Sequence, residues 1–374
     1  MRHSLSDRFR QLDPVVVGLG VGLLILGLAM LMSATGPVAI QRTGDSLYLV
    51  KRQLLLGVLP GSFLFLFFAL VDYRIWKKYA FFALAGSVIL LLLVYVPGLG
   101  VRVGGSLSWL SVGGFRFQPS ELVKMGFLIY LAAWLSSRSV ASLRDWRESL
   151  VPFGGALGVI VLLLVLQPDT GSMAVIAGTS VLLYMVAGAP VLWFAGLLAF
   201  GAGLFWLLIK FSPYRAARFM TFLRPELDPQ GIGYHINQAM LAVASGGWLG
   251  TGYGKSRQKF LYLPEVEADS IFAVMAEEMG FVITLIILTA FAALVWRCFK
   301  NARDTKDRFG AYLSAGIGIW LALQAGLNIG SMIGLLPITG VTLPLVSHGG
   351  TSLAITMGML GLAAGIPKHA KDSR

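Results

Sequence analysis

The sequence predicts an all-α integral membrane protein with about ten transmembrane helices. Hydrophobic residues make up 56% of its 374 residues and charged residues only 13%, about half the charged share that is usual in soluble domains. Uncharged runs such as Val15–Met32 and Phe81–Val96 approach or reach the length of about 20 mostly apolar residues that crosses a bilayer. Such runs recur along the whole chain, which excludes a soluble fold.

Apolar segments of spanning length follow one another along the chain. The first begins after Arg2, Arg8 and Arg10; its length, the lack of a small-residue cleavage site and the spans that follow favour an anchor over a secretion signal. We expect a single polytopic membrane domain over 1–374, without a soluble domain or a repeat of fixed period. The predicted spans lie near 14–34, 53–71, 79–97, 119–137, 151–167, 171–188, 191–210, 269–297, 311–333 and 347–366.

The basic residues between spans predict the topology. The connections on the side of both termini carry 17 Lys and Arg residues, against 5 in the short connections opposite. The positive-inside rule therefore predicts that both termini are cytoplasmic. The formal charge of +12 reflects loops that face the cytoplasm and anionic lipid, and it does not indicate nucleic-acid binding. The one cysteine, Cys298, excludes an intramolecular disulfide and a Cys-based zinc site.

The segment 211–268, between spans seven and eight, is predicted to be a large extracytoplasmic loop. It is far longer than a typical connection, and such loops are usually functional or disordered. Ile232–Ala244 predicts a short amphipathic helix on the outer membrane surface. Because topology gives the basic residues here no role, we expect them to bind an anionic ligand. The candidates are Arg215, Arg218, Lys255, Arg257 and Lys259.

Polar groups also occur at the outer ends of spans, where burial in the membrane is costly. Glu121 and Lys124 are three residues apart and share one face of a helix that begins near Pro119. They form either a self-neutralised helix start or, with Gln118, the polar wall of an outward cavity that binds substrate. Asp169 either caps the helix that follows it or contributes to the same cavity.

The segment Leu263–Asp269 is the strongest candidate for a reaction centre. Asp269 stands where an N-cap would stand, so capping is the alternative to a catalytic role. Glu277 lies about 12 Å further along the predicted helix and must face the protein interior. With Glu265, these carboxylates lie beside the basic loop. The Pro- and Gly-rich segment Leu336–Ser352, which includes Ser347, predicts irregular backbone that lines a cavity, with Gln324 and Asn328 nearby in the bundle.

Together these motifs resemble the SEDS family (shape, elongation, division and sporulation) of bacterial peptidoglycan glycosyltransferases, over nearly the whole chain. Lys255–Lys259 and Tyr262–Glu265 favour its division branch, FtsW, over its elongation branch, RodA. Glu267 and Ser270 stand where the family usually has His and Phe, and Ser108 and His348 where it often has Arg and Tyr. The motifs that carry the resemblance are Gln118–Glu121, Gln167–Gly171, Arg224–Tyr234, Leu263–Glu278 and Leu336–Ser352.

The resemblance implies a polymerase of lipid II, a disaccharide-pentapeptide on undecaprenyl pyrophosphate, at the outer face of the bacterial cytoplasmic membrane and at the division septum. Asp269 keeps the family's proposed catalytic position and would act as the base of an inverting transfer. The basic residues would offset the charge of the departing pyrophosphate, with a divalent cation (Mg²⁺ or Mn²⁺) as a further candidate and no organic cofactor. The implied partners are a class B penicillin-binding protein transpeptidase and other divisome membrane proteins.

Two other functions fit the same sequence. A lipid II flippase would use the same cavity, but its charged positions should continue into the cytoplasmic half of the bundle, whereas here they cluster in the outer half. A non-catalytic scaffold that recruits a division transpeptidase would tolerate replacement of Asp269. The sequence favours the polymerase.

Overall fold

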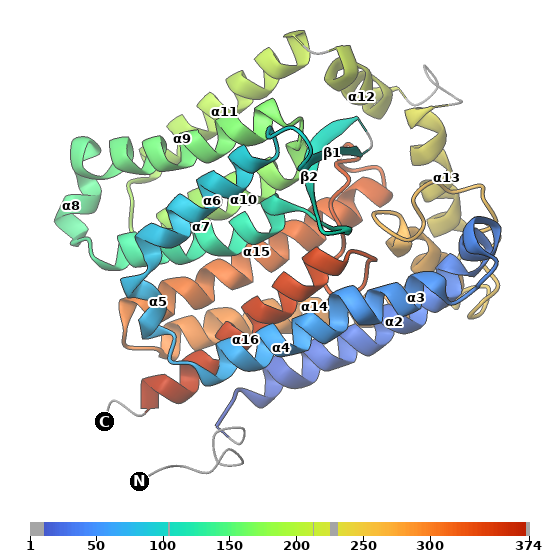
Figure 1. The fold of residues 1–374 in the computed structure, drawn as a ribbon, viewed down its shortest axis with the longest axis horizontal. Helices are drawn as coiled ribbons and strands as arrows, with labels where there is room; N and C mark the ends of the chain where they lie inside the picture. The colour runs from blue at the N-terminus through green and yellow to red at the C-terminus, as the bar shows by residue number, and fades with distance from the viewer. Residues whose placement is uncertain (1–10, 104, 212, 225–230, 372–374) are drawn as a thin grey trace.

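The computed structural model describes residues 11–103, 105–211, 213–224 and 231–371, which are mostly helical (Figure 1). The helices are α2 (Pro14–Thr43), α3 (Tyr48–Gln53), a π-helical turn (Leu54–Val58), α4 (Leu59–Leu70), α5 (Arg74–Lys78), α6 (Ala80–Leu93), α7 (Pro119–Ser136), α8 (Val140–Arg144), a second π-helical turn (Trp146–Leu150), α9 (Val151–Leu166), α10 (Thr170–Val186), α11 (Val191–Phe211), α12 (Pro213–Leu223), α13 (Ile232–Ser245), α14 (Ile271–Asp304), α15 (Arg308–Met332) and α16 (Gly350–Lys371).

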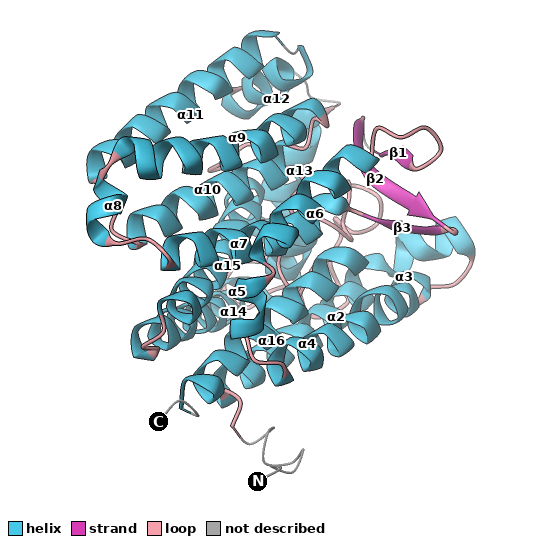
Figure 2. Ribbon diagram, turned by 60° about the vertical axis from the view of Figure 1, so that its left-hand side comes forward, coloured by secondary structure: helices cyan, strands magenta, loops and turns pink. Residues whose placement is uncertain are grey.

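A helix occupies each of the ten predicted spans, which confirms the prediction of a multi-pass membrane protein. In the described part of the chain, seven helical segments are long and apolar enough to cross a membrane. α6 and α10 are apolar but shorter, and α7 carries two buried charged residues, Glu121 and Lys124. The start of α2 and the last turns of α16 lie at the same end of the bundle (Figures 1 and 2), where the Asp13 N–H donates to the carbonyl of Ala364 (3.0 Å).

Three short strands between α6 and α7 form a small β-sheet, so the expectation of an all-α chain is wrong there. Strands β1 (Gly100–Val103), β2 (Ser106–Val112) and β3 (Phe115–Phe117) pair antiparallel in the order β1-β2-β3. Gly113 and Gly114 join β2 to β3 with φ of +59° and +86°, the backbone that a two-residue hairpin turn requires. The sheet lies at the end of the bundle opposite the last turns of α16 (Figure 1).

Close packing of α16 against α4 depends on small residues. A Cβ at Gly361 would collide with the backbone carbonyl of Phe65, and one at Gly365 would lie 2.9 Å from the carbonyl of Ala69. Glycine at both positions lets the two backbones approach, as is common between membrane helices. α4 and α16 therefore pack closely against each other.

A loop inserts into a break in α14. The helix is interrupted at Gly280, where φ is +71° and ψ is 179°. The loop before α14 satisfies the backbone groups that the break exposes: the Phe281 N–H donates to Gly247 O (2.9 Å) and the Val282 N–H to Trp248 O (3.1 Å). A Cβ at Gly280 would collide with the backbone of Gly250. The glycine therefore allows the loop 246–270 to be fixed against the first turns of α14.

Candidate active site

The predicted polar motifs gather at one end of the bundle. This end, called the distal end below, holds α3, α13, the β-sheet and the loop 246–270 (Figure 1). It also holds the N-terminal ends of α7, α14 and α16, at which three of the motifs lie. Segments far apart in the sequence therefore meet there.

Asp269 lies at the end of the loop 246–270, two residues before α14 begins, and is only 6% exposed. Its backbone carbonyl accepts a hydrogen bond from Asn328 Nδ2 of α15 (2.8 Å). Within the described residues, the only side-chain hydrogen bond to its carboxylate is a long one from Ser270 Oγ (3.5 Å). The N-cap of α14 is Ser270, without a side-chain capping bond. Asp269 thus does not cap α14, so helix capping does not explain the presence of this residue.

The electrostatic surroundings of Asp269 favour its protonated form. Burial and, to a smaller extent, the Glu265 carboxylate raise the pKa of Asp269 to about 7, although the Arg218 guanidinium and the Ser270 hydroxyl oppose this shift. A carboxylate that titrates near neutral pH is well matched to general base catalysis. Among the predicted site residues, Asp269 is therefore the strongest candidate for the base.

Glu267 connects the turn that carries Asp269 to two other parts of the fold. Its carboxylate pairs with Arg42 at the end of α2 (Nη1–Oε1, 2.8 Å), and its carbonyl accepts a hydrogen bond from the backbone N–H of His348 (2.7 Å). Ser270, the other position where the chain departs from the SEDS pattern beside Asp269, hydrogen-bonds to His235 of α13 (2.6 Å). Both departures therefore make specific contacts that hold this turn.

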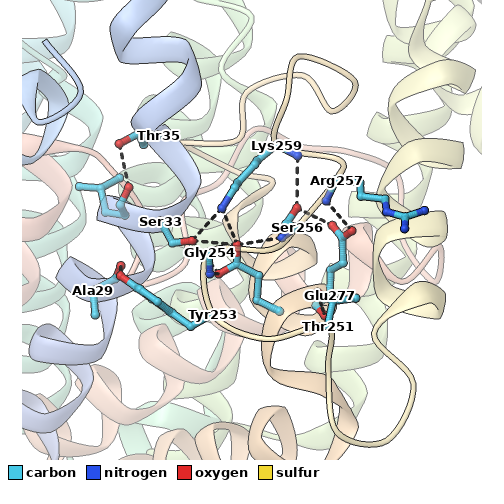
Figure 3. A network of polar contacts seen from close by, with 12 residues as sticks. Ala29, Ser33, Thr35, Thr251, Tyr253, Gly254, Ser256, Arg257, Lys259 and Glu277 are labelled. Carbon is cyan, nitrogen blue, oxygen red and sulfur yellow. Dashed lines mark hydrogen bonds and ion pairs between the residues drawn. The ribbon is translucent and has the colours of Figure 1, made fainter.

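Lys259, one of the basic residues predicted to bind an anionic ligand, forms a buried ion pair with Glu278 (2.8 Å). Ser33 of α2 hydrogen-bonds to both groups, at 2.6 and 2.8 Å from the two Glu278 oxygens and 3.1 Å from Lys259 Nζ (Figure 3). Both side chains are at most 5% exposed. Lys259 thus neutralises a buried carboxylate and joins the loop to α2 and α14.

Glu277 is buried in the protein interior as predicted, and its carboxylate holds the loop 246–270. Its carboxylate accepts hydrogen bonds from Ser256 Oγ (2.5 Å) and the Arg257 backbone N–H (2.8 Å) (Figure 3). Its backbone carbonyl accepts from the Thr251 N–H (2.9 Å). Glu277 therefore has a structural role in fixing the loop, and its role in substrate binding stays a prediction.

Glu121 and Lys124 pair as predicted, at 2.8 Å, and both are 5% exposed. Lys124 Nζ also donates to Gln324 Oε1 of α15 (3.0 Å), and Gln324 Nε2 donates to the carbonyl of Thr342 (3.1 Å). Glu121 Oε2 has no hydrogen-bond partner among the described residues. The pair is thus a self-neutralised connection between α7, α15 and the segment before α16, with one carboxylate oxygen unused.

Asp169 caps α10, since its Oδ1 accepts from the Ser172 N–H (3.0 Å). Its other carboxylate oxygen accepts from Gln118 Nε2 (3.1 Å) and Ser120 Oγ (2.8 Å) at the start of α7. Gln118 and Asp169 thus meet, as expected of neighbouring motifs, but they hold the starts of two helices together. Their role in binding substrate stays a prediction.

Ser347 stabilises a turn in the segment Leu336–Ser352. Its Oγ accepts from the Leu343 N–H (2.8 Å), and its carbonyl accepts from Gln53 Nε2 (3.2 Å). The side chain is buried, so any contact with substrate would require this turn to open.

The predicted cations differ in accessibility. Lys255 and Arg257 are exposed, whereas Arg218 is partly buried, lies 3.5 Å from the Ile338 carbonyl and acts on Asp269. The side chain of Arg215 and residues 225–230, within the motif Arg224–Tyr234, lie outside the described residues. Among the predicted cations whose side chains the structure describes, Arg218 is therefore the one that lowers the pKa of Asp269.

Contacts across long sequence separations could not be assigned from the sequence. The roles of Arg42, Ser33, His235 and Asn328 follow only from the fold, although His235 and Asn328 lie in polar segments that hydropathy marks as unusual. Within the described part of the chain, no three His, Cys, Asp or Glu side chains converge to hold a metal ion.

A bundle of membrane-spanning helices indicates a multi-pass membrane protein, and the buried carboxylate of Asp269 at one end of the bundle is its candidate acid–base site. The family model for the FtsW, RodA and SpoVE proteins, described as "Cell cycle protein", matches residues 15–372. The chain belongs to this family, and the resemblance to the SEDS proteins is confirmed.

Relatives and solved structures agree with this assignment. The chain is 37% identical to "Stage V sporulation protein E" of Bacillus subtilis, over 96% of this chain and 98% of that protein. It is 39% identical to the "Probable peptidoglycan glycosyltransferase FtsW" of Thioalkalivibrio sulfidiphilus, over 94% and 88% of the two chains. A solved structure of "a peptidoglycan synthase complex" matches with a TM-score of 0.78 at 27% identity, over 96% and 98% of the chains. RodA of Thermus thermophilus matches with a TM-score of 0.70 at 28% identity, over 95% and 96%.

Proposed function

We propose that this chain is an inverting glycosyltransferase that polymerises lipid II into peptidoglycan strands at the outer face of the bacterial cytoplasmic membrane. The observation that carries the proposal is the environment of Asp269, a buried carboxylate without a capping bond or an ion pair among the described residues. The names of the relatives, which include several probable peptidoglycan glycosyltransferases, support the choice of reaction.

In the proposed reaction, a sugar hydroxyl of one lipid II attacks the anomeric carbon of a second. The new glycosidic bond forms as the bond to the pyrophosphate oxygen breaks, with inversion at the carbon. The Asp269 carboxylate takes the proton of the attacking hydroxyl and releases it to solvent before the next cycle. Undecaprenyl pyrophosphate leaves, and Arg215, Arg218, Lys255 and Arg257 offset its negative charge. Lys259 contributes indirectly, because it fixes the loop that carries Lys255 and Arg257.

The wall of the substrate cavity, in this proposal, includes Gln118, Glu121, Lys124, Asp169 and Ser347. The free Glu121 oxygen supports a contact with substrate, because a buried acceptor without a partner is costly to keep. Glu265, an exposed carboxylate beside Asp269, would face the incoming sugar.

A divalent cation, Mg²⁺ or Mn²⁺, enters the proposal only as a companion of the substrate. Mg²⁺ in proteins is often held largely by phosphate oxygens and water, with one or two carboxylates. No described cluster of three ligands supports a resident metal, so we assign no step to one. Polymerisation in the presence of EDTA, and its recovery with added Mg²⁺ or Mn²⁺, tests this part.

We propose ten transmembrane spans with both termini in the cytoplasm and residues 211–268 outside. The common position of the α2 start and the α16 end supports an even number of spans. Cys298 is buried, so single cysteines should be introduced at the exposed positions Phe260 and Lys306 after Cys298→Ser. A membrane-impermeant maleimide should label residue 260 and not residue 306 in whole cells; labelling of residue 306 would contradict this topology.

The relatives named FtsW support a role in septal wall synthesis, together with a class B penicillin-binding protein and other divisome membrane proteins. A glycan made at one site must reach a transpeptidase to be crosslinked, so a side-by-side complex follows from the chemistry. Septal localisation of a fluorescent fusion, and copurification with the transpeptidase encoded by the same organism, test this role.

Purified protein in detergent micelles, supplied with lipid II, tests the enzymatic function. A polymerase lengthens glycan without any membrane to cross, and Asp269→Asn should abolish this activity. A flippase would make no polymer in detergent and would move lipid II across a vesicle membrane. A scaffold would show no polymer with or without its transpeptidase partner, so each alternative has its own outcome.

A further inference from the structure

The hydroxyl of Ser270 lies at a junction next to the candidate base. Ser270 is fully buried, and its Oγ lies 2.6 Å from His235 Nε2, 2.8 Å from the carbonyl of Pro264 and 3.5 Å from Asp269 Oδ1. His235 belongs to α13, whereas Pro264, Asp269 and Ser270 belong to the turn that leads into α14. The hydrogen bond between Ser270 and His235 therefore joins α13 to the turn that carries Asp269.

The single proton of the Ser270 hydroxyl determines the direction of these hydrogen bonds. The Pro264 carbonyl can only accept, and so can the ionised Asp269 carboxylate. The hydroxyl proton therefore goes to one of these two oxygens, and His235 must donate its Nε2–H to Ser270 Oγ. Burial and the Arg218 guanidinium lower the pKa of His235 to about 4, so the ring is neutral and carries its one proton on Nε2.

We propose that His235 is a positioning residue for Asp269, which donates Nε2–H to Ser270 Oγ and so fixes the turn 264–270 around the base. With the hydroxyl oriented by this bond, its proton remains available to Pro264 or to the Asp269 carboxylate. Asn328 holds the Asp269 backbone from α15 (2.8 Å), so the base is fixed from two sides. This inference rests on the proposed role of Asp269.

The charged groups that face this junction come from two elements. Glu265, in the same turn, disfavours the ionised form of Asp269, whereas Arg218, on α12, favours it. Arg218 also acts on His235. Loss of the Ser270 hydroxyl leaves these charges in place and removes a hydrogen bond that stabilises the carboxylate. The pH at which polymerisation falls should therefore move upward.

The test compares His235→Phe, which keeps a planar ring without a donor, with His235→Gln, which keeps an N–H donor. We expect His235→Phe to lower kcat about 10- to 100-fold with little change in KM for lipid II, because small displacements of a catalytic group are costly. His235→Gln should recover most of this loss. Ser270→Ala should also lower kcat and shift the acid limb of the pH profile upward, and Ser270→Thr should resemble the wild type.

A double variant tests whether the two residues act through one bond. His235→Phe with Ser270→Ala should be little worse than the more impaired single variant, since both remove the same interaction. Ser314→Ala removes an equally buried hydroxyl that donates to Cys298 O of α14, and it should leave kcat unchanged.

Several outcomes would overturn the inference: wild-type kcat and pH profile in His235→Phe, equal losses in His235→Phe and His235→Gln, or additive losses in the double variant. If His235→Phe does not fold, the comparison of Ser270→Ala with Ser270→Thr decides. An inactive Asp269→Asn beside an unaffected His235→Phe would reject only the positioning role. An active Asp269→Asn would reject the proposed base itself.

Discussion

Replacement of Asp269 by asparagine should abolish activity and, at the same time, stabilise the fold. The change keeps the size of the side chain and removes only its charge and basicity. General base catalysis is typically worth about 10²–10⁴-fold, so we expect polymerisation to fall by that factor. The opposite effect on stability follows from the burial of an unpaired carboxylate.

The expected gain in stability can be worked from the pKa of Asp269. Burial raises this pKa from 3.8 to about 7. A shift of one unit in the pKa of a group on folding changes the free energy of unfolding by up to about 1.4 kcal/mol. The protonated form is the one that the fold favours, so the stabilisation is complete below pH 3.8 and is lost as the pH rises through 7. At pH 8 the wild type therefore bears a cost of up to about 4 kcal/mol, which asparagine avoids.

Thermal unfolding in detergent at pH 8 and pH 5, combined with polymerisation of lipid II, measures both effects. Asp269→Asn should unfold at a higher temperature than the wild type at pH 8, with a smaller difference at pH 5. Asp13→Asn is the matched control, because Asp13 is also buried but pairs with Arg297 (2.7 Å) and should lose stability. A destabilised Asp269→Asn would refute the electrostatic argument, and wild-type turnover would refute the catalytic role.

Three further variants test the neighbouring charges. Exchanging Glu121 and Lys124 should leave expression normal and lower polymerisation strongly; retained turnover would make the pair purely structural. Lys255→Gln with Arg257→Gln should weaken binding of lipid II more than binding of a neutral glycolipid, and equal losses would contradict pyrophosphate recognition. Lys259→Met leaves Glu278 buried without its cation and should cost about 3–5 kcal/mol of unfolding free energy, seen as a lower Tm; an unchanged Tm would contradict the structural role of Lys259.

The helices could be predicted because the bilayer imposes one strong constraint, a long apolar run for each span. Each of the ten predicted ranges contains a helix, although boundaries differ; α2, for example, continues to Thr43 beyond the predicted residue 34. Residues 100–117 lie outside that constraint, so hydropathy gave no indication of their structure. The pair Gly113-Gly114 between short runs of alternating residues was the available signal for a hairpin.

The site could be predicted only in part, because its contacts join distant segments. The pairing of Glu121 with Lys124 was predicted correctly, because their spacing places them on one helix face. Asp269 was selected because charges at membrane depth are rare, and its catalytic role stays a prediction. The sequence could not show that Lys259 neutralises Glu278, a pairing that depends on the break in α14. Nor could it show Ser33, which lies 245 residues before Glu278 in the chain.

Among the buried acidic residues that the structure describes, Asp269 differs from the others in its lack of a compensating cation or set of hydrogen bonds. Burial of a carboxylate is costly unless a cation or several hydrogen bonds compensate for it. Five of the six buried acids in the described residues have such compensation, from the following groups: Arg297 for Asp13, Lys124 for Glu121, Arg42 for Glu267, Ser256 and the Arg257 N–H for Glu277, and Lys259 for Glu278. Asp269 has one long hydrogen bond. Among the described residues, the other five buried carboxylates are compensated, whereas Asp269 is not. This contrast supports the proposed catalytic role of Asp269, because an asparagine at this position would avoid the cost of burying a charge.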